Sequence, residues 1–355
     1  NLGRVTIRRE LRNVSSLAQT SNTTANKEST TYKTSGNGRG QVSSVTYRAG
    51  ETGAALHKKT FIYDVFGRVN TVSTTIGNVD QFVEETTYDQ HSRVFQQFDA
   101  SGDDHGLRYV YSNGYLSKIK EAREGVEGTV YQDVLTMDAR GNVTTMQLGN
   151  GVAVHATYEA ASGRLTNLSA FDSFGVEKQD VDYLFDVLGN LKSRNDQSGL
   201  NTSLKETFNY DSLNRLNRVQ LTAPELGITA PTTTLSLNYT RDGNINCKSD
   251  VAGVGNASGC FNTTFSNYSY GSNAGPHAVT NAGGVSYNYD ANGNQTSASN
   301  GRNISYTVFD KPASITSNAD RTDFSYGIGN SRYQRIDSKN SMVQKSTLYL
   351  NAVER

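Results

Sequence analysis

The sequence contains no tryptophan, four prolines and two cysteines among 355 residues. Two cysteines cannot supply the cysteine-rich ligand sets of structural zinc sites. No apolar run approaches the roughly 20 residues that a membrane-spanning helix needs, so we expect no membrane span. Basic and acidic residues are balanced at 34 each, and neither sign forms a block. We therefore expect no nucleic-acid partner, because nucleic-acid-binding proteins concentrate Lys and Arg on one face.

Aromatic and turn-forming residues are abundant in this otherwise polar chain. Hydrophobic residues make up 35% of it and the mean hydropathy is −0.58, yet it carries 20 Tyr, 13 Phe and 33 Gly. Disordered segments are poor in aromatic residues, so disorder does not explain this polarity. Tyr, Thr, Gly and Asn together are typical of short strands joined by tight turns. The composition predicts an all-β fold.

A short motif recurs along the chain, in the order aromatic, Asp, two variable residues, Gly, Arg or Asn, and an aliphatic residue. Its anchors between Tyr63 and Tyr239 lie 21 to 29 residues apart, a spacing that fits one β-hairpin per repeat. Less complete copies begin at Met137 and Tyr158, and degenerate copies lie at Tyr32, Tyr111, Phe309-Asp310 and Tyr326. We assign to the motif Tyr63, Asp64, Gly67, Arg68, Tyr88, Asp89, Phe185, Asp186, Gly189, Asn190, Tyr210, Asp211, Tyr289, Asp290, Gly293 and Asn294.

The chemistry of the motif indicates a turn. An Asp at the first turn position caps backbone amides ahead of it, and a Gly three residues later accepts a positive φ. Asn214 replaces this Gly in one copy, and Asn is the residue that next best tolerates positive φ. The apolar residues after the turn alternate with one slip, which predicts a β-bulge. We expect the aromatic residue to fill one face of the sheet.

Two regions depart from the repeat. Residues 222–234, with two of the four prolines, are predicted to form a long hairpin loop. An insertion is predicted at about residues 246–288, within a single repeat domain that spans residues 1–355. The insertion holds Cys247 and Cys260, which would form a disulfide in a secreted protein and stay reduced in a cytosolic one. The chain does not begin with Met, so we expect a fragment or a processed product.

Candidate chemical sites have simpler structural explanations. Asp103-Asp104-His105 lies in a polar, Gly-flanked segment, and we expect a solvated loop there. Residues 290–294 resemble a calcium loop, but Gly301 stands where an EF-hand has its bidentate Glu. No Gly-x-Ser-x-Gly nucleophile motif is found in the sequence. We expect no catalytic residue, no cofactor, no metal site and no enzymatic activity.

The repeated unit resembles the tyrosine-aspartate (YD) repeats of bacterial Rhs proteins, insecticidal-toxin C subunits and teneurins. The segment Gly275-Pro276-His277-Ala278-Val279, followed by the motif at Tyr289, is similar to Rhs-core sequence. The resemblance extends from about Tyr32 to Tyr349. It implies a long sheet of hairpins that curves and spirals as part of a hollow shell or barrel. The repeat number is small for a closed shell, so an open or partial one is expected.

The resemblance also implies a function. In Rhs proteins the shell encloses a C-terminal toxin, so the expected partners are an enclosed toxin polypeptide or further YD repeats of the parent protein. Rhs proteins end in an aspartate-protease segment followed by a variable toxin. Neither segment has a match in this sequence after Tyr349. A secreted or cell-surface bacterial effector, assembled in the cytoplasm before export, is expected. The alternative is a cell-surface adhesion or carbohydrate-binding module.

Overall fold

The structure is a computed structural model that describes residues 3–12, 23–77, 80–123, 126–198, 203–271, 275–351 and 353–355. The regular elements of these residues are β-strands and the single-turn 3-10 helices η1 (Pro224–Leu226) and η3 (Ile328–Asn330). The all-β prediction is confirmed. The strands of the first half are β1 (Ile7–Arg12), β2 (Thr23–Tyr32), β3 (Val42–Ala49), β4 (Ala55–Tyr63), β5 (Val69–Ile76), β6 (Asp80–Tyr88), β7 (Val94–Phe98), β8 (Gly106–Ser112), β9 (Tyr115–Arg123), β10 (Val126–Met137), β11 (Val143–Leu148), β12 (Ala153–Tyr158), β13 (Leu165–Phe171) and β14 (Glu177–Phe185). Those of the second half are β15 (Leu191–Asp196), β16 (Leu204–Tyr210), β17 (Leu216–Ala223), β18 (Ile228–Tyr239), β19 (Ile245–Lys248), β20 (Tyr268–Tyr270), β21 (Val279–Ala282), β22 (Val285–Tyr289), β23 (Gln295–Ala298), β24 (Arg302–Tyr306), β25 (Pro312–Ser317), β26 (Asp320–Tyr326), β27 (Arg332–Lys339), β28 (Met342–Leu350) and β29 (Val353–Glu354).

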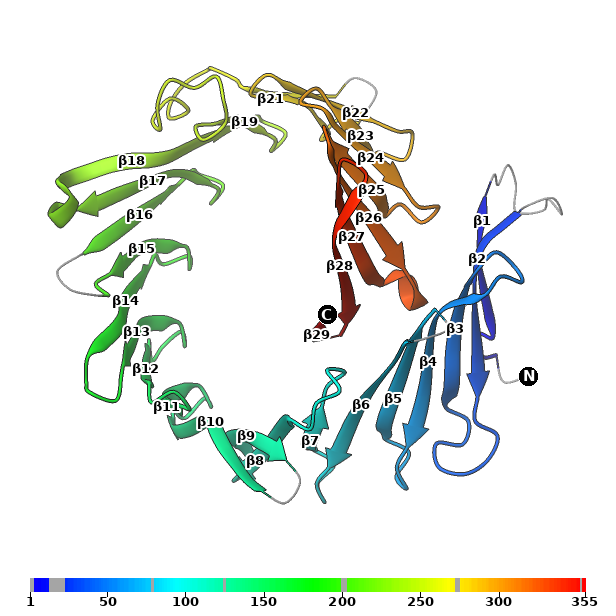
Figure 1. Ribbon diagram of the computed structural model, residues 1–355. Helices are drawn as coiled ribbons and strands as arrows, with labels where there is room; N and C mark the ends of the chain where they lie inside the picture. Colours follow the sequence, from blue (N-terminus) through cyan, green and yellow to red (C-terminus); the bar gives the residue numbers. More distant parts are fainter. Residues whose placement is uncertain are drawn as a thin grey trace. The chain divides into compact units, whose positions relative to one another are not determined.

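The described strands belong to two antiparallel sheets, one of 19 strands (β1–β19) and one of 10 (β20–β29). Within each sheet, strands that follow one another in the chain pair with each other, as Figure 1 shows for β4, β5 and β6. The contacts between residues divide the chain into two compact units. Unit 1 comprises residues 1–109, 121–128 and 294–355, and unit 2 comprises residues 110–120 and 129–293.

The predicted bulge is present at the motif turns. In the β4–β5 pair the register shifts between Ile62 and Tyr63, so the aromatic residue of the motif stands at the irregular position. The same shift occurs at Tyr88, Phe185 and Tyr210. A bulge bends its strand and strengthens the local twist. The motif therefore places a bend at the end of each hairpin that it builds.

The prediction of a long loop over residues 222–234 is wrong. Strands β17 and β18 pair as far as Ala223 and Ile228, and the 3-10 turn η1 between them closes the hairpin at Gly227. Pro231 lies in a stretch of β18 where the register shifts, between residues paired to β17. A strand tolerates Pro at such an irregularity, because no ladder bond needs its missing N–H.

Buried side chains are thinly spread along both units. In unit 1 they include Tyr47, Tyr63 and Phe82, and in unit 2 they include Val181 and Leu237. A sheet that stacks hairpins buries each one mainly against its neighbours, as in other repeat architectures. Within the described residues, no helix is long and apolar enough to cross a membrane.

Candidate functional site: the repeated turn and its tyrosine

The motif aspartate caps its own turn with one carboxylate oxygen. Asp64 Oδ1 accepts the backbone N–H of Phe66 at 2.9 Å and that of Arg68 at 2.9 Å. The backbone closes the same turn, since Asp64 N–H donates to the Arg68 carbonyl and Gly67 N–H donates to the Asp64 carbonyl. The same two side-chain bonds recur at Asp89, Asp186 and Asp211.

The second oxygen explains why Arg and Asn alternate four residues after the aspartate. Arg215 Nε donates to Asp211 Oδ2 at 2.7 Å, whereas Asn190 Nδ2 donates to Asp186 Oδ2 at 2.9 Å. Arg68 binds Asp64 in the same way as Arg215 binds its partner. Both residue types present an N–H at the same point, so either completes the turn.

These bonds hold the aspartates in the ionised state. The side-chain amide of Asn190 is the largest cause that lowers the pKa of Asp186, followed by backbone N–H donors. Desolvation opposes ionisation of Asp211, but the side chain and backbone of Arg215 outweigh it and lower its pKa. A carboxylate whose oxygens already accept several N–H groups is a poor general base.

The turn requires positive φ at its fourth position. Gly67 has φ 78° and Gly189 has φ 93°, and Asn214 adopts φ 60° in place of glycine, as the sequence predicts. Ser92 takes the same conformation, with φ 65°. The position is constrained by backbone geometry, because only glycine avoids a steric cost there.

The motif tyrosine ties each repeat to the one before it. The Tyr210 hydroxyl donates to the carbonyl of Leu191 at 2.8 Å, and Leu191 is the aliphatic residue that ends the preceding motif. Tyr88 binds the carbonyl of Val69 in the same way, at 2.9 Å. The other tyrosine donors and their carbonyl acceptors are Tyr32 and Val5, Tyr63 and Val42, Tyr158 and Val143, Tyr239 and Leu216, Tyr270 and Ile245, Tyr289 and Val279, Tyr306 and Gln295, and Tyr326 and Pro312.

Sequence reasoning did not find this bond, because its acceptor is a backbone carbonyl in another repeat. The motif arginine adds a second contact between the same two repeats, because it lies over the tyrosine ring of the repeat that follows it. The Arg68 guanidinium lies 4.3 Å from the ring centroid of Tyr88, and that of Arg215 lies 4.3 Å from the ring centroid of Tyr239. A cation over an aromatic face is attracted by the ring quadrupole. Phe185 keeps the ring of the motif without the hydroxyl.

The motif at Tyr289 follows the same plan. Asp290 Oδ1 accepts the N–H of Asn292 at 2.9 Å, and Gly293 has φ 85°. The Asn294 side chain donates to Asp310 Oδ1 at 2.8 Å. Asp290 is thus engaged in a hairpin turn, the structure that the sequence favoured over a calcium loop for residues 290–294.

At two turns the structure differs from the prediction. The prediction that a degenerate copy lies at Phe309-Asp310 is wrong: Tyr306 occupies the aromatic position, and Asp310, with φ 57°, occupies the glycine position. Thr307 replaces the capping Asp and accepts the N–H of Lys311. A further capped turn at Asp172 was missed, although Phe171-Asp172 and Gly175 carry the motif spacing.

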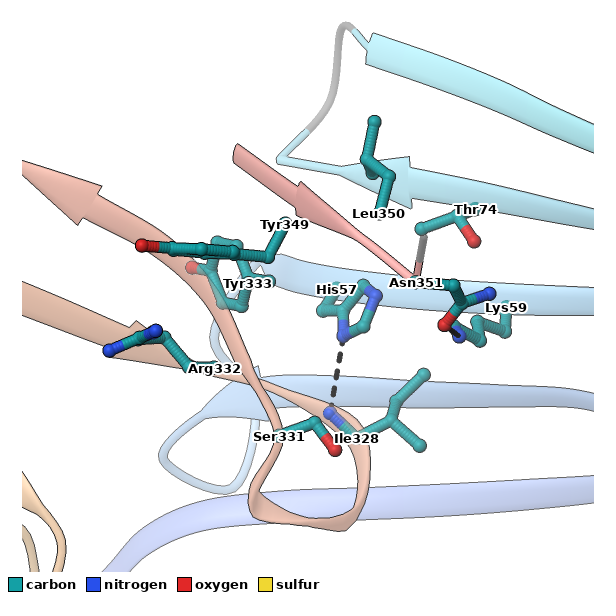
Figure 2. Close-up of a pocket in the computed structure, with 10 residues that line it drawn as sticks. All are labelled: His57, Lys59, Thr74, Ile328, Ser331, Arg332, Tyr333, Tyr349, Leu350 and Asn351. Atoms are coloured by element: carbon teal, nitrogen blue, oxygen red, sulfur yellow. Dashed lines mark hydrogen bonds between the residues drawn. The ribbon is translucent and has the colours of Figure 1, made fainter. Parts of the chain in front are cut away.

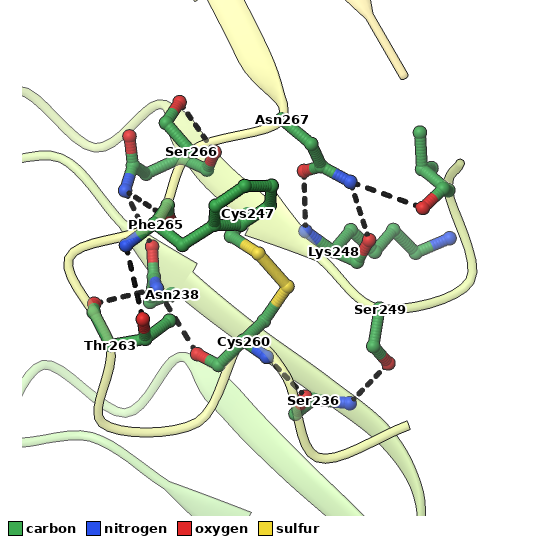
Figure 3. The surroundings of a disulfide bond; sticks show 12 residues. Ser236, Asn238, Cys247, Lys248, Ser249, Cys260, Thr263, Phe265, Ser266 and Asn267 are labelled. Carbon is green, nitrogen blue, oxygen red and sulfur yellow. Dashed lines mark hydrogen bonds between the residues drawn. A yellow bond between two sulfur atoms is a disulfide. The ribbon is translucent and has the colours of Figure 1, made fainter. Parts of the chain in front are cut away.

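Cys247 and Cys260 lie fully buried in unit 2, and a disulfide joins them (Figure 3). The loop that it closes is held by side chains bonded to backbone. Ser236 Oγ accepts the N–H of Cys260 and donates to the Ala257 carbonyl. Asn267 bonds both the N–H and the carbonyl of Lys248. Residues 249–267 contain no strand, so these bonds satisfy a backbone that has no ladder partner.

Asp103, Asp104 and His105 lie on an exposed segment of unit 1, as expected for a solvated loop. His105 Nδ1 lies 2.6 Å from Glu121 Oε1, and Arg123 Nε lies 3.1 Å from Asp104 Oδ2. In the part of the chain that the structure describes, no group of three His, Cys, Asp or Glu is placed to hold a metal ion.

A cavity of about 230 Å³ lies within unit 1 and is lined in part by Ile328, Ser331 and Arg332, which follow Tyr326 in the chain. Figure 2 shows His57, Lys59 and Thr74, from β4 and β5, together with Tyr333 of β27 and Asn351, which follows β28. His57 Nδ1 accepts the N–H of Ile328 at 3.2 Å. This meeting of segments was not predicted, since its residues share no motif.

No family model and no curated protein match this chain. Solved structures do. The crystal structure of TcdB2-TccC3-Cdc42 is 18% identical, with a TM-score of 0.66 over 94% of this chain. The crystal structure of TcdB2-TccC3-TEV is 17% identical, with a TM-score of 0.65 over 94%. A Photorhabdus luminescens Tc holotoxin pore with a mutated TccC3 is 18% identical, with a TM-score of 0.63 over 94%.

These identities establish a shared fold. The match covers 20% of the first two chains and 19% of the third, so this chain spans about a fifth of their length. It therefore has the fold of one part of the TcdB2-TccC3 assemblies, which is the fold that the YD-repeat resemblance implied.

Proposed function

We propose that this chain is a structural segment of the shell of a secreted Rhs-type polymorphic toxin. The shell would enclose a C-terminal toxin polypeptide that is not part of this chain. The observation that carries the proposal is the fold shared with TcdB2-TccC3 structures over 94% of the chain. The contacts of the motif residues support the proposal, because these residues bond to their own turn or to the preceding repeat.

The same residues favour a non-enzymatic role. The motif aspartates accept backbone and side-chain N–H groups of their own turns, and the tyrosine hydroxyls donate to carbonyls of neighbouring repeats. Groups engaged in this way are not free to bind or activate a substrate. What they do is mechanical: they tie each hairpin to the previous one and resist separation of the wall.

The proposed shell consists of one YD-repeat domain over residues 1–355, with residues of about 246–288 as an insertion. Its partners would be the enclosed polypeptide and further YD repeats of the parent protein. We place it in a bacterial effector that is assembled in the cytoplasm and then secreted or displayed at the cell surface. Covering a toxin until delivery protects both the toxin and the cell that makes it.

The competing hypothesis is a cell-surface adhesion or carbohydrate-binding module. Such a module needs exposed aromatic faces with free polar groups nearby. The hydroxyls of the motif tyrosines donate to backbone carbonyls, and motif arginines cover the ring faces of some of these tyrosines. The contacts of the repeats therefore favour the shell.

Protease protection of the parent polypeptide tests the proposal. We expect a C-terminal segment that follows the repeats to resist protease while the repeats are intact, and to be digested when the repeats are first unfolded. The matched control is the same C-terminal segment expressed without the repeats. Equal digestion rates with and without the repeats would contradict the shell, and binding to a glycan array would favour the alternative.

A further inference from the structure

The C-terminal residues of unit 1 fold back onto its N-terminal strands. We name residues 327–351 and 353–355 the C-terminal latch. Its turn η3 lies against β2, β3 and β4, where Gly329 N–H donates to Glu28 Oε2 at 2.8 Å. Further along, Asn351 Nδ2 donates to both carboxylate oxygens of Glu84 at 2.7 Å. These contacts join residues that lie 301 and 267 positions apart in the sequence.

An apolar cluster supports these polar contacts. Leu350 of the latch is buried together with Phe82 and Ala100, and Leu348 and Val353 pack around them. The Arg355 guanidinium lies 5.8 Å from the ring centroid of Phe82. The latch is thus a docked segment with an apolar anchor and a polar rim, an arrangement common to protein interfaces.

His57 stands where the latch turn meets β4. Its side chain is only 5% exposed, and Nδ1 accepts the N–H of Ile328 at 3.2 Å (Figure 2). The loop passes so close that a Cβ on Gly327 would lie 2.2 Å from Nδ1. The Tyr333 ring covers another side, 5.3 Å from the imidazole by ring centroids. Nδ1 must be unprotonated in this arrangement, because it accepts a hydrogen bond.

We infer that the latch is acid-sensitive, closed while His57 is neutral and released when the His57 imidazole takes up a proton. Protonation would set an N–H on Nδ1 against the N–H of Ile328, with no room between them for a water molecule. Two donors face to face lose the hydrogen bond and leave a buried charge.

The charged side chains that line the cavity offer that charge no compensation. Of the described residues that line the cavity, Lys59 on β4 and Arg332 on β27 carry charge, and both are cations. Tyr333 and Tyr349 present phenols, and burial raises the pKa of Tyr333, which keeps it neutral. On β2 the Glu28 carboxylate is bonded to Gly329, and on β3 the Tyr47 hydroxyl is bonded to Glu10.

The direction of the pH effect follows from these surroundings. Burial, with the charge of Lys59, lowers the pKa of His57 from 6.5 to about 4. The released state, in which His57 regains its ordinary pKa, binds the proton more tightly than the closed state. Closure is therefore fully favoured above pH 6.5 and weakens as the pH falls from 6.5 toward 4. At pH 5 the opening equilibrium rises about 30-fold, and its limit below pH 4 is about 300-fold.

Hydrogen exchange of the 355-residue chain tests the inference. With rates corrected for intrinsic pH dependence, peptides that cover Ile328–Tyr333 should lose about 30-fold in protection between pH 7.5 and pH 5. The variant H57Q keeps an acceptor oxygen and cannot be protonated, so its protection should change by less than about threefold. The control variant H155Q alters an exposed histidine on β12 and should behave as the wild type does.

Unchanged wild-type protection, or an equal loss of protection in H57Q, would overturn the inference. A second measurement does not depend on any variant folding. Imidazole signals of the five histidines can be titrated by NMR in the wild-type chain. His57 should titrate well below its ordinary pKa of 6.5, together with the loss of latch protection. A His57 midpoint near 6.5 in the folded chain would overturn the acid-sensitive latch.

Discussion

The repeated turns and the disulfide loop of unit 2 solve one problem in two ways. Both must satisfy backbone groups where the chain leaves the ladder. At Asp186 a single side chain does so within five residues, through bonds to Leu188 and Asn190. In the loop 249–267, bonds from Ser236 and Asn267 reach across the sequence, and a disulfide holds the segment closed. The turn is self-contained, whereas the loop depends on distant partners.

This difference predicts where damage spreads. A change in a repeated turn should stay within its hairpin and the next one, because the contacts of the turn are local. A change in the loop should release the whole segment at once, because its backbone bonds depend on a closure that spans 13 residues. Three variants, ordered from the largest expected effect to the smallest, test that contrast.

The largest effect is expected from the double substitution of Cys247 and Cys260 by serine. Loss of a cross-link over 13 residues removes about 3 kcal/mol of constraint on the unfolded state. Hydrogen exchange should show that residues 249–267 lose protection while the turn at Asp186 keeps its own. Equal loss of protection at Asp186 would show that the loop also supports the repeats.

A smaller effect is expected from Gly243→Ala at a motif turn. Gly243 has φ 88°, and no atom lies within 4 Å of an added Cβ, so the cost comes from backbone strain alone. We expect the β18–β19 hairpin to lose about 1–2 kcal/mol, measured by hydrogen exchange. The matched control is Gly255→Ala in the disulfide loop, where the added Cβ also has open space and φ is not positive. An equal loss of stability at both positions would contradict the conclusion that the motif turn requires a residue that tolerates positive φ.

The smallest effect is expected from Tyr210→Phe, which deletes the hydroxyl and keeps the ring. The bond to the Leu191 carbonyl is lost, at a cost of about 1 kcal/mol, and exchange should increase on β15 and β16. Tyr115→Phe is the control, since that side chain is 57% exposed. If the two substitutions behave alike, the hydroxyl does not tie one repeat to the next.

Much of this fold could be predicted because its information is local. The Asp cap, the positive φ and the bulge at Tyr63 all lie within seven residues, so residue type and spacing reveal them together. The sequence alone points to Phe309-Asp310 instead of Tyr306, because Thr307 stands at the usual Asp position of the turn and Asp310 stands at the usual Gly position. A single sequence cannot separate such a substitution from a shifted copy.

The sequence by itself determined the hairpin turns, since each turn is stabilised by side chains that stand beside it in the chain. Only the tertiary structure decided what those hairpins contact. The acceptor of the Tyr210 hydroxyl is a backbone carbonyl, which every residue possesses and no motif can mark. His57 meets Ile328 across 271 positions, and its burial comes from strands that no local pattern brings together. Contacts of this kind depend on how the sheets pack, and packing is a property of the whole fold.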